Sequence, residues 1–302
     1  MLPEYPKFKS LESEDVNQIK QHLKQAAPKI CEWALANLFI WKDFDHTLLT
    51  IIHKNLCIYI SPPNEPPYFL EPFGIHKIPE TTGICLKHAG KISRVSEDFV
   101  SGLNLYKYRI ICLRNQFDYI YQTKALAELQ GRKFDGKRNH IKKFNNRFPN
   151  HEFIHLDASH KNDALKLFDT WFDKKRETSY FAKLPHPFQK SAINKAFSYF
   201  EPLNMMGGAI LIEKEMKGFI LGSPLNPETI AIHFQYGDPS IYGISQILLW
   251  EACHKIFSSF RHINLEQDLG IPGLRKAKLS YHPLRLEKKF EVRPIQKGPE
   301  RA

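Results

Sequence analysis

Two stretches of the chain carry side chains whose types and spacing could do chemistry. The first is "NLEQDLGIPGLRKAKLSYHP" (264–283), in which Glu266 and Asp268 end an expected strand and a Pro-Gly pair opens an expected helix. The N–H groups of a helix's first turn can bind an anion. Cations at that end oppose the helix dipole, so Arg275 and Lys276 are placed better for a ligand than for helix stability.

A carboxylate just before such a helix can orient an amine or accept its proton, although an Arg-to-carboxylate structural pair is an equally simple interpretation. Only "LGIPG" separates the strand end from the helix start, so we expect the flanking side chains to lie close together. We predict that they line one pocket. The candidate catalytic residues are Glu266, Asp268, Lys276 and Lys278.

The second stretch is "GRKFDGKRNHIKKFNNRF" (131–148), which holds seven cationic side chains and one carboxylate. Ile141, Phe144 and Phe148 form an apolar stripe that predicts a helix with one buried face. Each pair of like charges four residues apart destabilises an isolated helix by roughly 0.2–0.5 kcal/mol. Two interpretations stay open: a solvated face with partners elsewhere in the fold, or a phosphate-binding surface.

Composition limits the class of protein. The 302 residues include 42% hydrophobic side chains, enough for one large or two medium domains, and a net charge of +11 favours anionic partners. The five cysteines form no C-x-x-C pair and the histidines show no metal-ligand spacing, so we predict neither a disulfide framework nor a metal site. No signal peptide or apolar run of about 18 residues is seen, which predicts a cytoplasmic protein without a membrane segment.

The periodicity predicts mixed α and β structure in both halves. An apolar run at 30–41 reads as a helix, and 48–60 reads as a hairpin that turns at Lys54-Asn55. The last hundred residues read as helix, hairpin, third strand, a buried helix over 242–260, and strand. This is the element order of a GNAT (N-acyltransferase) domain.

Two long motifs, "DYIYQTKALAELQGRKFDGKRNHIKKF" (118–144) and "INLEQDLGIPGLRKAKLSYHP" (263–283), resemble the domain-of-unknown-function 2156 family. That family is grouped with the C-terminal catalytic domain of phosphatidylglycerol lysyltransferases. "ANLFIW" (36–41) resembles its N-terminal signature. The resemblance implies an α/β (α+β) fold of two GNAT-like domains in tandem, each a mixed, mostly antiparallel sheet with flanking helices, as in Fem-type transferases that use aminoacyl-tRNA.

The expected domains are 1–120 and 121–302, the second including the basic helix 131–148. Lysyltransferases also have a many-helix membrane portion, which nothing here could supply. Many family members carry an acidic, lysine-containing stretch where this chain has "FQYGDPSIYG" (234–243), and "YGISQ" (242–246) distantly resembles the pyrophosphate-binding start of the GNAT helix. The residues expected to bind the donor or substrate are Lys137, Arg138, Asn139, His140, Lys142, Lys143, Tyr242, Arg275 and Tyr281.

We therefore expect an acyl or aminoacyl transferase that moves a group from acyl-CoA or aminoacyl-tRNA to an amine or hydroxyl of a small-molecule or lipid acceptor. No tightly bound cofactor is expected, and tRNA is the expected macromolecular partner. Lys276 or Lys278 would stabilise the oxyanion, while Glu266 or Asp268 would orient or deprotonate the acceptor. A GNAT-like module that binds RNA or protein without catalysis is the alternative. The sequence leaves the oligomeric state open.

Overall fold

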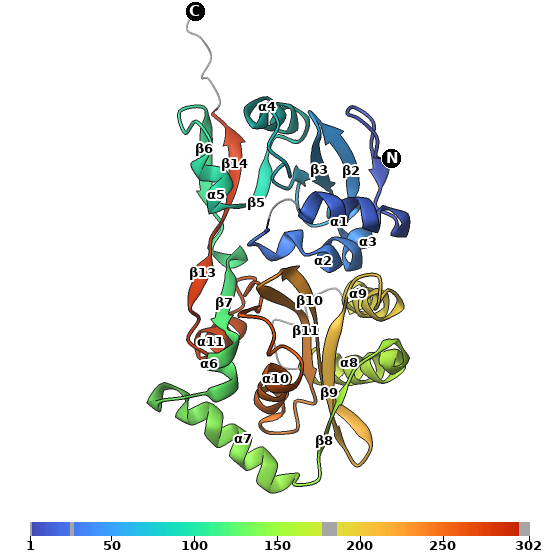
Figure 1. Cartoon of the computed structure of the whole chain (residues 1–302), viewed down its shortest axis with the longest axis vertical. Helices are drawn as coiled ribbons and strands as arrows, with labels where there is room; N and C mark the ends of the chain where they lie inside the picture. The colour runs from blue at the N-terminus through green and yellow to red at the C-terminus, as the bar shows by residue number, and fades with distance from the viewer. Residues whose placement is uncertain (1, 25–26, 177–185, 296–302) are drawn as a thin grey trace, which may run out of the picture. The chain divides into compact units, whose positions relative to one another are not determined.

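A computed structural model describes residues 2–24, 27–176 and 186–295. The chain forms two compact units, one made of 1–117 together with the C-terminal residues from 287 onward, and one made of 118–286. Each unit is built on a seven-stranded mixed sheet with flanking helices (Figure 1), so the predicted fold class is confirmed. Among the described residues, no helix is both long enough and apolar enough to cross a membrane.

The described part of unit 1 contains the α-helices α1 to α5 and the strands of the first sheet. Its helices are α1 (Val16–Lys24), α2 (Leu35–Ile40), α3 (Lys42–Asp45), α4 (Ile78–Ala89) and α5 (Glu97–Ser101). Its strands are β1 (Lys9–Ser10), β2 (Leu48–Ile52), β3 (Asn55–Ile60), β4 (Tyr68–Phe69), β5 (Ile92–Ser96), β6 (Tyr108–Cys112) and β14 (Lys289–Pro294).

Unit 2 contains the two motifs and the second sheet. Its helices are α6 (Thr123–Glu128), α7 (Asp135–Arg147), α8 (Lys161–Arg176), α9 (His186–Ser198), α10 (Ile244–Lys255) and α11 (Pro272–Leu279). The strands of its sheet are β7 (Asp118–Gln122), β8 (Glu152–His155), β9 (Met206–Ile212), β10 (Glu215–Asn226), β11 (Thr229–Gly237), β12 (His262–Asn264) and β13 (Arg285–Glu287).

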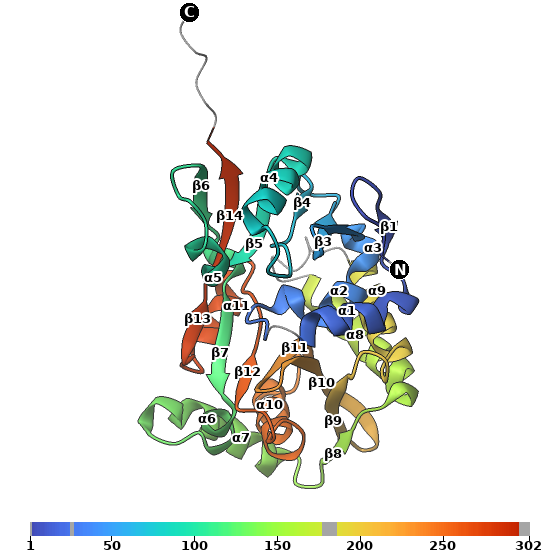
Figure 2. The ribbon, with the colours of Figure 1, turned by 45° about the horizontal axis from the view of Figure 1, so that its top comes forward.

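The strands of the two sheets follow the same spatial order relative to the sequence. In each sheet one strand comes from outside the run of consecutive strands that forms the rest. The first runs β1-β2-β3-β4-β5-β14-β6 and the second β8-β9-β10-β11-β12-β7-β13. In each, the fourth and fifth strands pair in parallel, β4 with β5 and β11 with β12. The sixth place is filled by β14 in the first sheet and by β7 in the second (Figure 2). Because β14 pairs with β5 and β6, the described residues 287–295 belong to unit 1, whereas the expected C-terminal domain includes them.

Helices cover both faces of the second sheet. Gly237 faces α10, because a Cβ atom there would lie 2.8 Å from Ile244. Its neighbour Tyr236 points to the opposite face, since side chains alternate along a strand. There its ring centroid lies 5.1 Å from that of Phe168 and 4.8 Å from that of Trp171, both on α8. The sheet is therefore the central layer of unit 2.

The basic helix α7 packs on α10 by the predicted apolar stripe. Ile141 and Phe144 are buried in the core shared with α10. Gly243, just before α10, has φ of 84°, and a Cβ atom would lie 2.7 Å from the carbonyl oxygen of His140. Only glycine combines this backbone conformation with so close an approach. The start of α10 is thus fixed against α7.

Several predicted elements differ in extent from the structure. The 30–41 run forms a 3-10 turn, η2 (Cys31–Trp33), followed by the short α2, rather than one helix. The 48–60 hairpin turns at His53 and Lys54, which both have positive φ, one residue earlier than expected. The buried helix α10 ends at Lys255 rather than near 260.

The loop between β12 and α11 is folded around the carboxylate of Asp268, whose side chain is fully buried. Oδ1 accepts hydrogen bonds from the Gly270 N–H at 2.8 Å and Arg275 Nη2 at 2.9 Å. Oδ2 accepts from Arg275 Nε at 2.8 Å and the Tyr119 hydroxyl at 2.6 Å. Although burial opposes ionisation, hydrogen bonds from Arg275 and Tyr119 hold the pKa of Asp268 well below its usual range.

We expect Asp268→Asn to lower the free energy of unfolding at pH 7 by about 2–4 kcal/mol, because it removes the charge that pairs with Arg275 in a buried setting. A carboxyl whose pKa is depressed by folding contributes stability that is lost as the pH falls. The difference between wild type and variant should therefore shrink below about pH 4. Urea titrations measure it, with the exposed Asp173→Asn as control. Equal effects of the two substitutions would contradict this role.

Glu71 in unit 1 has the opposite behaviour. Its carboxylate accepts hydrogen bonds from Ser96 N at 2.7 Å and Ser96 Oγ at 2.8 Å, but burial raises its pKa to about 7. Negative charge on Glu32 and Asp98 adds to the rise. Because the folded protein then holds the proton more tightly than the unfolded chain, stability falls as the pH rises from about 4.5 to 7.

Glu71→Gln should remove this dependence. Relative to wild type, the variant should gain about 2–3 kcal/mol between pH 5 and pH 8, since a tenfold change in proton affinity corresponds to about 1.4 kcal/mol. Urea titrations at the two pH values provide the measurement. Parallel stability profiles for the two proteins would show that Glu71 is ionised in the folded state throughout this range.

Candidate functional site

The candidate site lies where β11 and β12 part. Their parallel pairing covers only Thr229↔His262 to Ala231↔Asn264, although β11 continues to Gly237. The chain after β12 instead follows β7: Leu265 N donates to Tyr119 O at 3.0 Å, and Tyr119 N donates to Glu266 O at 3.4 Å. The second sheet is therefore split between its fourth and fifth strands.

A β-bulge places His233 at this split. On the β10 side of β11, Leu221 pairs with Phe234 and Gly222 pairs with Ile232, so His233 is the extra residue. Its side chain is fully buried, although the residue as a whole is partly exposed, so the exposure belongs to its main chain. Bulges of this kind redirect a side chain and are frequent beside active sites.

Three side chains form a continuous polar chain at the bulge. Ser223 Oγ lies 2.8 Å from His233 Nε2, and His233 Nδ1 lies 2.8 Å from Glu266 Oε1. Ser223 is 1% exposed and the Glu266 side chain 16%, so Glu266 is the member that solvent or a ligand reaches. The sequence did not point to Ser223 or His233, because β10, β11 and the end of β12 are brought together only by the sheet.

The backbone of Glu266 is held in an unusual conformation. Its φ is 56°, which is uncommon for a residue other than glycine. Its N–H donates to Asn264 Oδ1 at 2.7 Å, and Asn264 Nδ2 donates to Asp118 Oδ2 at 2.9 Å, with both partners fully buried. Such backbone strain is typical of functional sites that the surrounding structure fixes.

The other predicted catalytic residues have different surroundings. The Lys278 ammonium donates to the carbonyl oxygens of Leu265 and Gln267, which flank Glu266. Lys276 lines a pocket of about 560 Å³. The remaining lining residues are Gly270, Pro272, Arg275, Leu279 and Ser280. Of the four predicted residues, Lys276 lines this pocket, whereas Lys278 and Asp268 form hydrogen bonds to protein groups around Glu266.

The second group of predicted residues is partly gathered at α7. Lys137 Nζ donates to Ser280 Oγ at 2.7 Å and lies 3.7 Å from the centre of the Tyr281 ring, and burial lowers the pKa of Lys137 to about 8. The His140 ring stacks on Tyr242 at 4.6 Å, and burial together with nearby Lys137 lowers the pKa of His140. Because Ser280 also lines the pocket, this aromatic and cationic group adjoins it.

The remaining cations of α7 are divided. Arg138 turns back on its own segment, where it donates to the carbonyl oxygens of Leu129 and Gly131 and pairs with Asp135. Asn139, Lys142 and Lys143 are exposed, and Lys143 Nζ lies 5.6 Å from the Tyr242 ring centre. Arg138 is therefore partly engaged by its own segment although its side chain is 45% exposed, and Lys142 and Lys143 are exposed as well.

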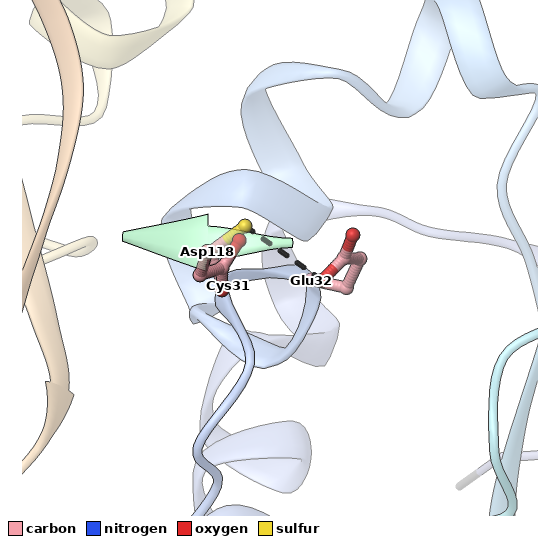
Figure 3. A group of neighbouring side chains, drawn as sticks. All are labelled: Cys31, Glu32 and Asp118. Carbon is pink, nitrogen blue, oxygen red and sulfur yellow. Dashed lines mark hydrogen bonds between the residues drawn. The ribbon is translucent and has the colours of Figure 1, made fainter. Parts of the chain in front are cut away.

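We assign no ion to the cysteine and carboxylates near η2. Figure 3 draws Cys31 and Glu32, both in unit 1, together with Asp118, the first residue of unit 2. Glu32 pairs with the buried Lys289, Cys31 Sγ donates to Glu32 Oε2 at 3.7 Å, and Asp118 accepts from Asn264. Each carboxylate therefore has a partner within its own unit.

Known proteins resemble the chain over most of its length. A protein of unknown function from Bacteroides thetaiotaomicron is 26% identical, with a TM-score of 0.88 over 98% of this chain and 100% of the other. The C-terminal domain (DUF2156) of a putative lysylphosphatidylglycerol synthetase from Agrobacterium fabrum is 13% identical, with a TM-score of 0.65 over 93% and 91%. An uncharacterised protein of Mycoplasmoides gallisepticum is 22% identical over 78% of this chain and 74% of its own.

A family model decides the assignment. The model described as "Phosphatidylglycerol lysyltransferase, C-terminal" matches residues 7–293, which include both sheets, the split and the basic helix. A tandem GNAT protein from the clavulanic acid biosynthesis pathway is 8% identical and shares the fold, with a TM-score of 0.50 over 97% of this chain and 99% of the other. The chain therefore belongs to the family of the phosphatidylglycerol lysyltransferase C-terminal domain.

Proposed function

We propose that the protein transfers an aminoacyl or acyl group from aminoacyl-tRNA or acyl-CoA to an amine or hydroxyl acceptor. The observation that carries the proposal is the split beside the β11 bulge, with the partly exposed carboxylate of Glu266 next to it. Main chain exposed at a split in a sheet can bind an extended acyl group by hydrogen bonds. The carboxylate then lies beside the reacting carbonyl.

Glu266 is the group that orients the acceptor and takes its proton. Asp268 is less suited to that part, since its depressed pKa and its pairing with Arg275 disfavour proton uptake. The nucleophilic amine or hydroxyl attacks the donor's carbonyl, and the proton passes to the leaving oxygen of tRNA or the leaving sulfur of CoA. Each cycle thus ends with Glu266 ionised again.

Lys276 and Arg275 supply positive charge in the adjoining pocket. They lie on the first turns of α11, where the N–H groups of the helix add to the positive potential. A phosphate of the donor suits this pocket, because Arg and Lys bind phosphate oxygens by charge-assisted hydrogen bonds. Lys278 keeps the carbonyls on both sides of Glu266 in place.

Helix α7 is the proposed surface for a phosphate-rich donor. Lys142 and Lys143 are exposed, and Lys143 lies near the Tyr242 ring on which His140 stacks. Exposed cations next to aromatic rings suit a nucleotide, whose phosphates bind cations and whose bases stack on rings. Aminoacyl-tRNA offers many more phosphates than CoA, so this surface favours tRNA of the two donors.

Glu266→Gln should lower turnover about 10²–10⁴-fold, the usual contribution of a positioned general base. The assay follows transfer of labelled lysine from lysyl-tRNA to vesicles that contain phosphatidylglycerol, and in parallel the release of CoA from acetyl-CoA with a mixture of amines. The exposed Glu152→Gln is the matched control. Full activity in Glu266→Gln would exclude it as the base, and a wild type that binds tRNA without turnover would identify a binding module.

Lys142→Gln with Lys143→Gln should weaken binding of bulk tRNA and reduce the log–log salt slope by up to about 2, roughly 0.7–0.9 for each phosphate that is no longer neutralised. Fluorescence anisotropy between about 50 and 200 mM salt measures the slope. The control is Lys87→Gln with Lys107→Gln, which removes the same charge from exposed sites of unit 1. If both double variants behave alike, the α7 cations are only a solvated face.

A further inference from the structure

We propose that His233, with Ser223 behind it, is the positioning residue for Glu266; this inference rests on the proposed function, in which Glu266 meets the acceptor. The chain Ser223–His233–Glu266 is joined by two hydrogen bonds, each 2.8 Å long. Neither the predicted site nor the family assignment includes Ser223 or His233. In this proposal the bulge of β11 orients the His233 side chain toward the general base, Glu266.

The direction of the hydrogen bonds follows from the chemistry of the three groups. An ionised carboxylate only accepts, so the proton of a neutral His233 must lie on Nδ1, which donates to Glu266 Oε1. Nε2 is then an acceptor, and the hydroxyl of Ser223 donates to it. The Glu266 carboxylate therefore fixes the tautomer of His233, Ser223 satisfies its Nε2, and His233 in turn holds one carboxylate oxygen of Glu266.

Burial makes this arrangement effective. The His233 ring is fully buried and Ser223 is 1% exposed, so water does not compete for these two hydrogen bonds. Glu266 is the outward end of the chain. With Oε1 held by the imidazole and its backbone held by Asn264, the carboxylate has few rotamers left, which reduces the entropy lost when the acceptor is bound.

A structural role alone explains the geometry less well. A buried histidine that merely fills space does not require a β-bulge or a hydrogen bond at each ring nitrogen. Nor does it require that the carboxylate partner, Glu266, has a positive φ. These features all restrict the orientation of Glu266. We therefore expect His233 to act on turnover through Glu266, and to affect the Michaelis constant little.

The first experiment does not depend on turnover. Long-range ¹H–¹⁵N correlation spectra of protein labelled with ¹⁵N-histidine, assigned with His233→Gln, should show the neutral Nδ1–H tautomer of His233. Ser223→Ala removes only the donor to Nε2, so the Nε2 resonance should shift while the Nδ1–H tautomer persists. An Nε2–H tautomer in the wild type would overturn the proposal, whether or not the protein transfers an acyl group.

The second experiment uses the transfer assay with lysyl-tRNA and phosphatidylglycerol vesicles or acetyl-CoA. Asn places an amide N–H near the position of histidine Nδ1, whereas Gln places one near Nε2 and leaves Glu266 without its donor. His233→Gln should lower kcat about 10–100-fold with KM nearly unchanged, and His233→Asn should recover most of it. Equal losses in the two variants, or losses that track melting temperature, would show a packing role.

A double variant distinguishes a positioning role of His233 from a packing role. If His233 acts through Glu266, then His233→Gln in the Glu266→Gln background should cause no further loss of kcat. Multiplying losses would overturn the positioning role. The exposed His155→Gln is the control for histidine removal. If the wild type shows no turnover with either donor, the proposed function fails, and the tautomer of His233 alone tests the proposed hydrogen-bond chain. If His233→Gln does not fold, Ser223→Ala is used for both the spectra and the transfer assay.

Discussion

The site depends on the ion pair and hydrogen bonds of the buried Asp268 carboxylate. A charge in this position is tolerated only because four donors surround it, two from Arg275, one from Tyr119 and one from the Gly270 backbone. These donors come from β7, from the loop and from α11, so one side chain fixes three segments. Glu266 lies two residues before it and the pocket lies directly after it. The positions of both therefore follow from one ion pair.

The exchange of strands between the sheets has a direct consequence for this arrangement. β7 follows unit 1 in the chain, yet it supplies unit 2 with Tyr119 and Tyr121. Tyr119 donates to Asp268, and the Tyr121 hydroxyl donates to the carbonyl of Lys278 at 2.7 Å. A strand from outside the second half of the sequence is thus part of its site. The first motif of the family resemblance begins in this strand, at residue 118.

The residues of the second motif divide into those that support the site and those that a ligand can reach. Asp268 and Lys278 bond to protein groups around the Glu266 turn, whereas Glu266 and Lys276 keep part of their surface accessible. A buried charge with its hydrogen bonds satisfied stabilises a conformation, while an accessible one can meet a ligand. On α7 both Arg138 and Lys142 are exposed, and Arg138 also bonds to its own segment.

The sequence by itself determined the fold class, the apolar stripe of α7 and the stretch 264–283 that contains Glu266, because periodicity and turn residues act over short distances. It left the partners of Asp268 and Lys278 open, since a carboxylate beside a cation reads equally as a catalytic or a structural pair. Only the tertiary structure brought Ser223 and His233 to Glu266, and β14 to the first sheet. Strand pairing across large sequence separations decided both, and no local pattern encodes which strands become neighbours.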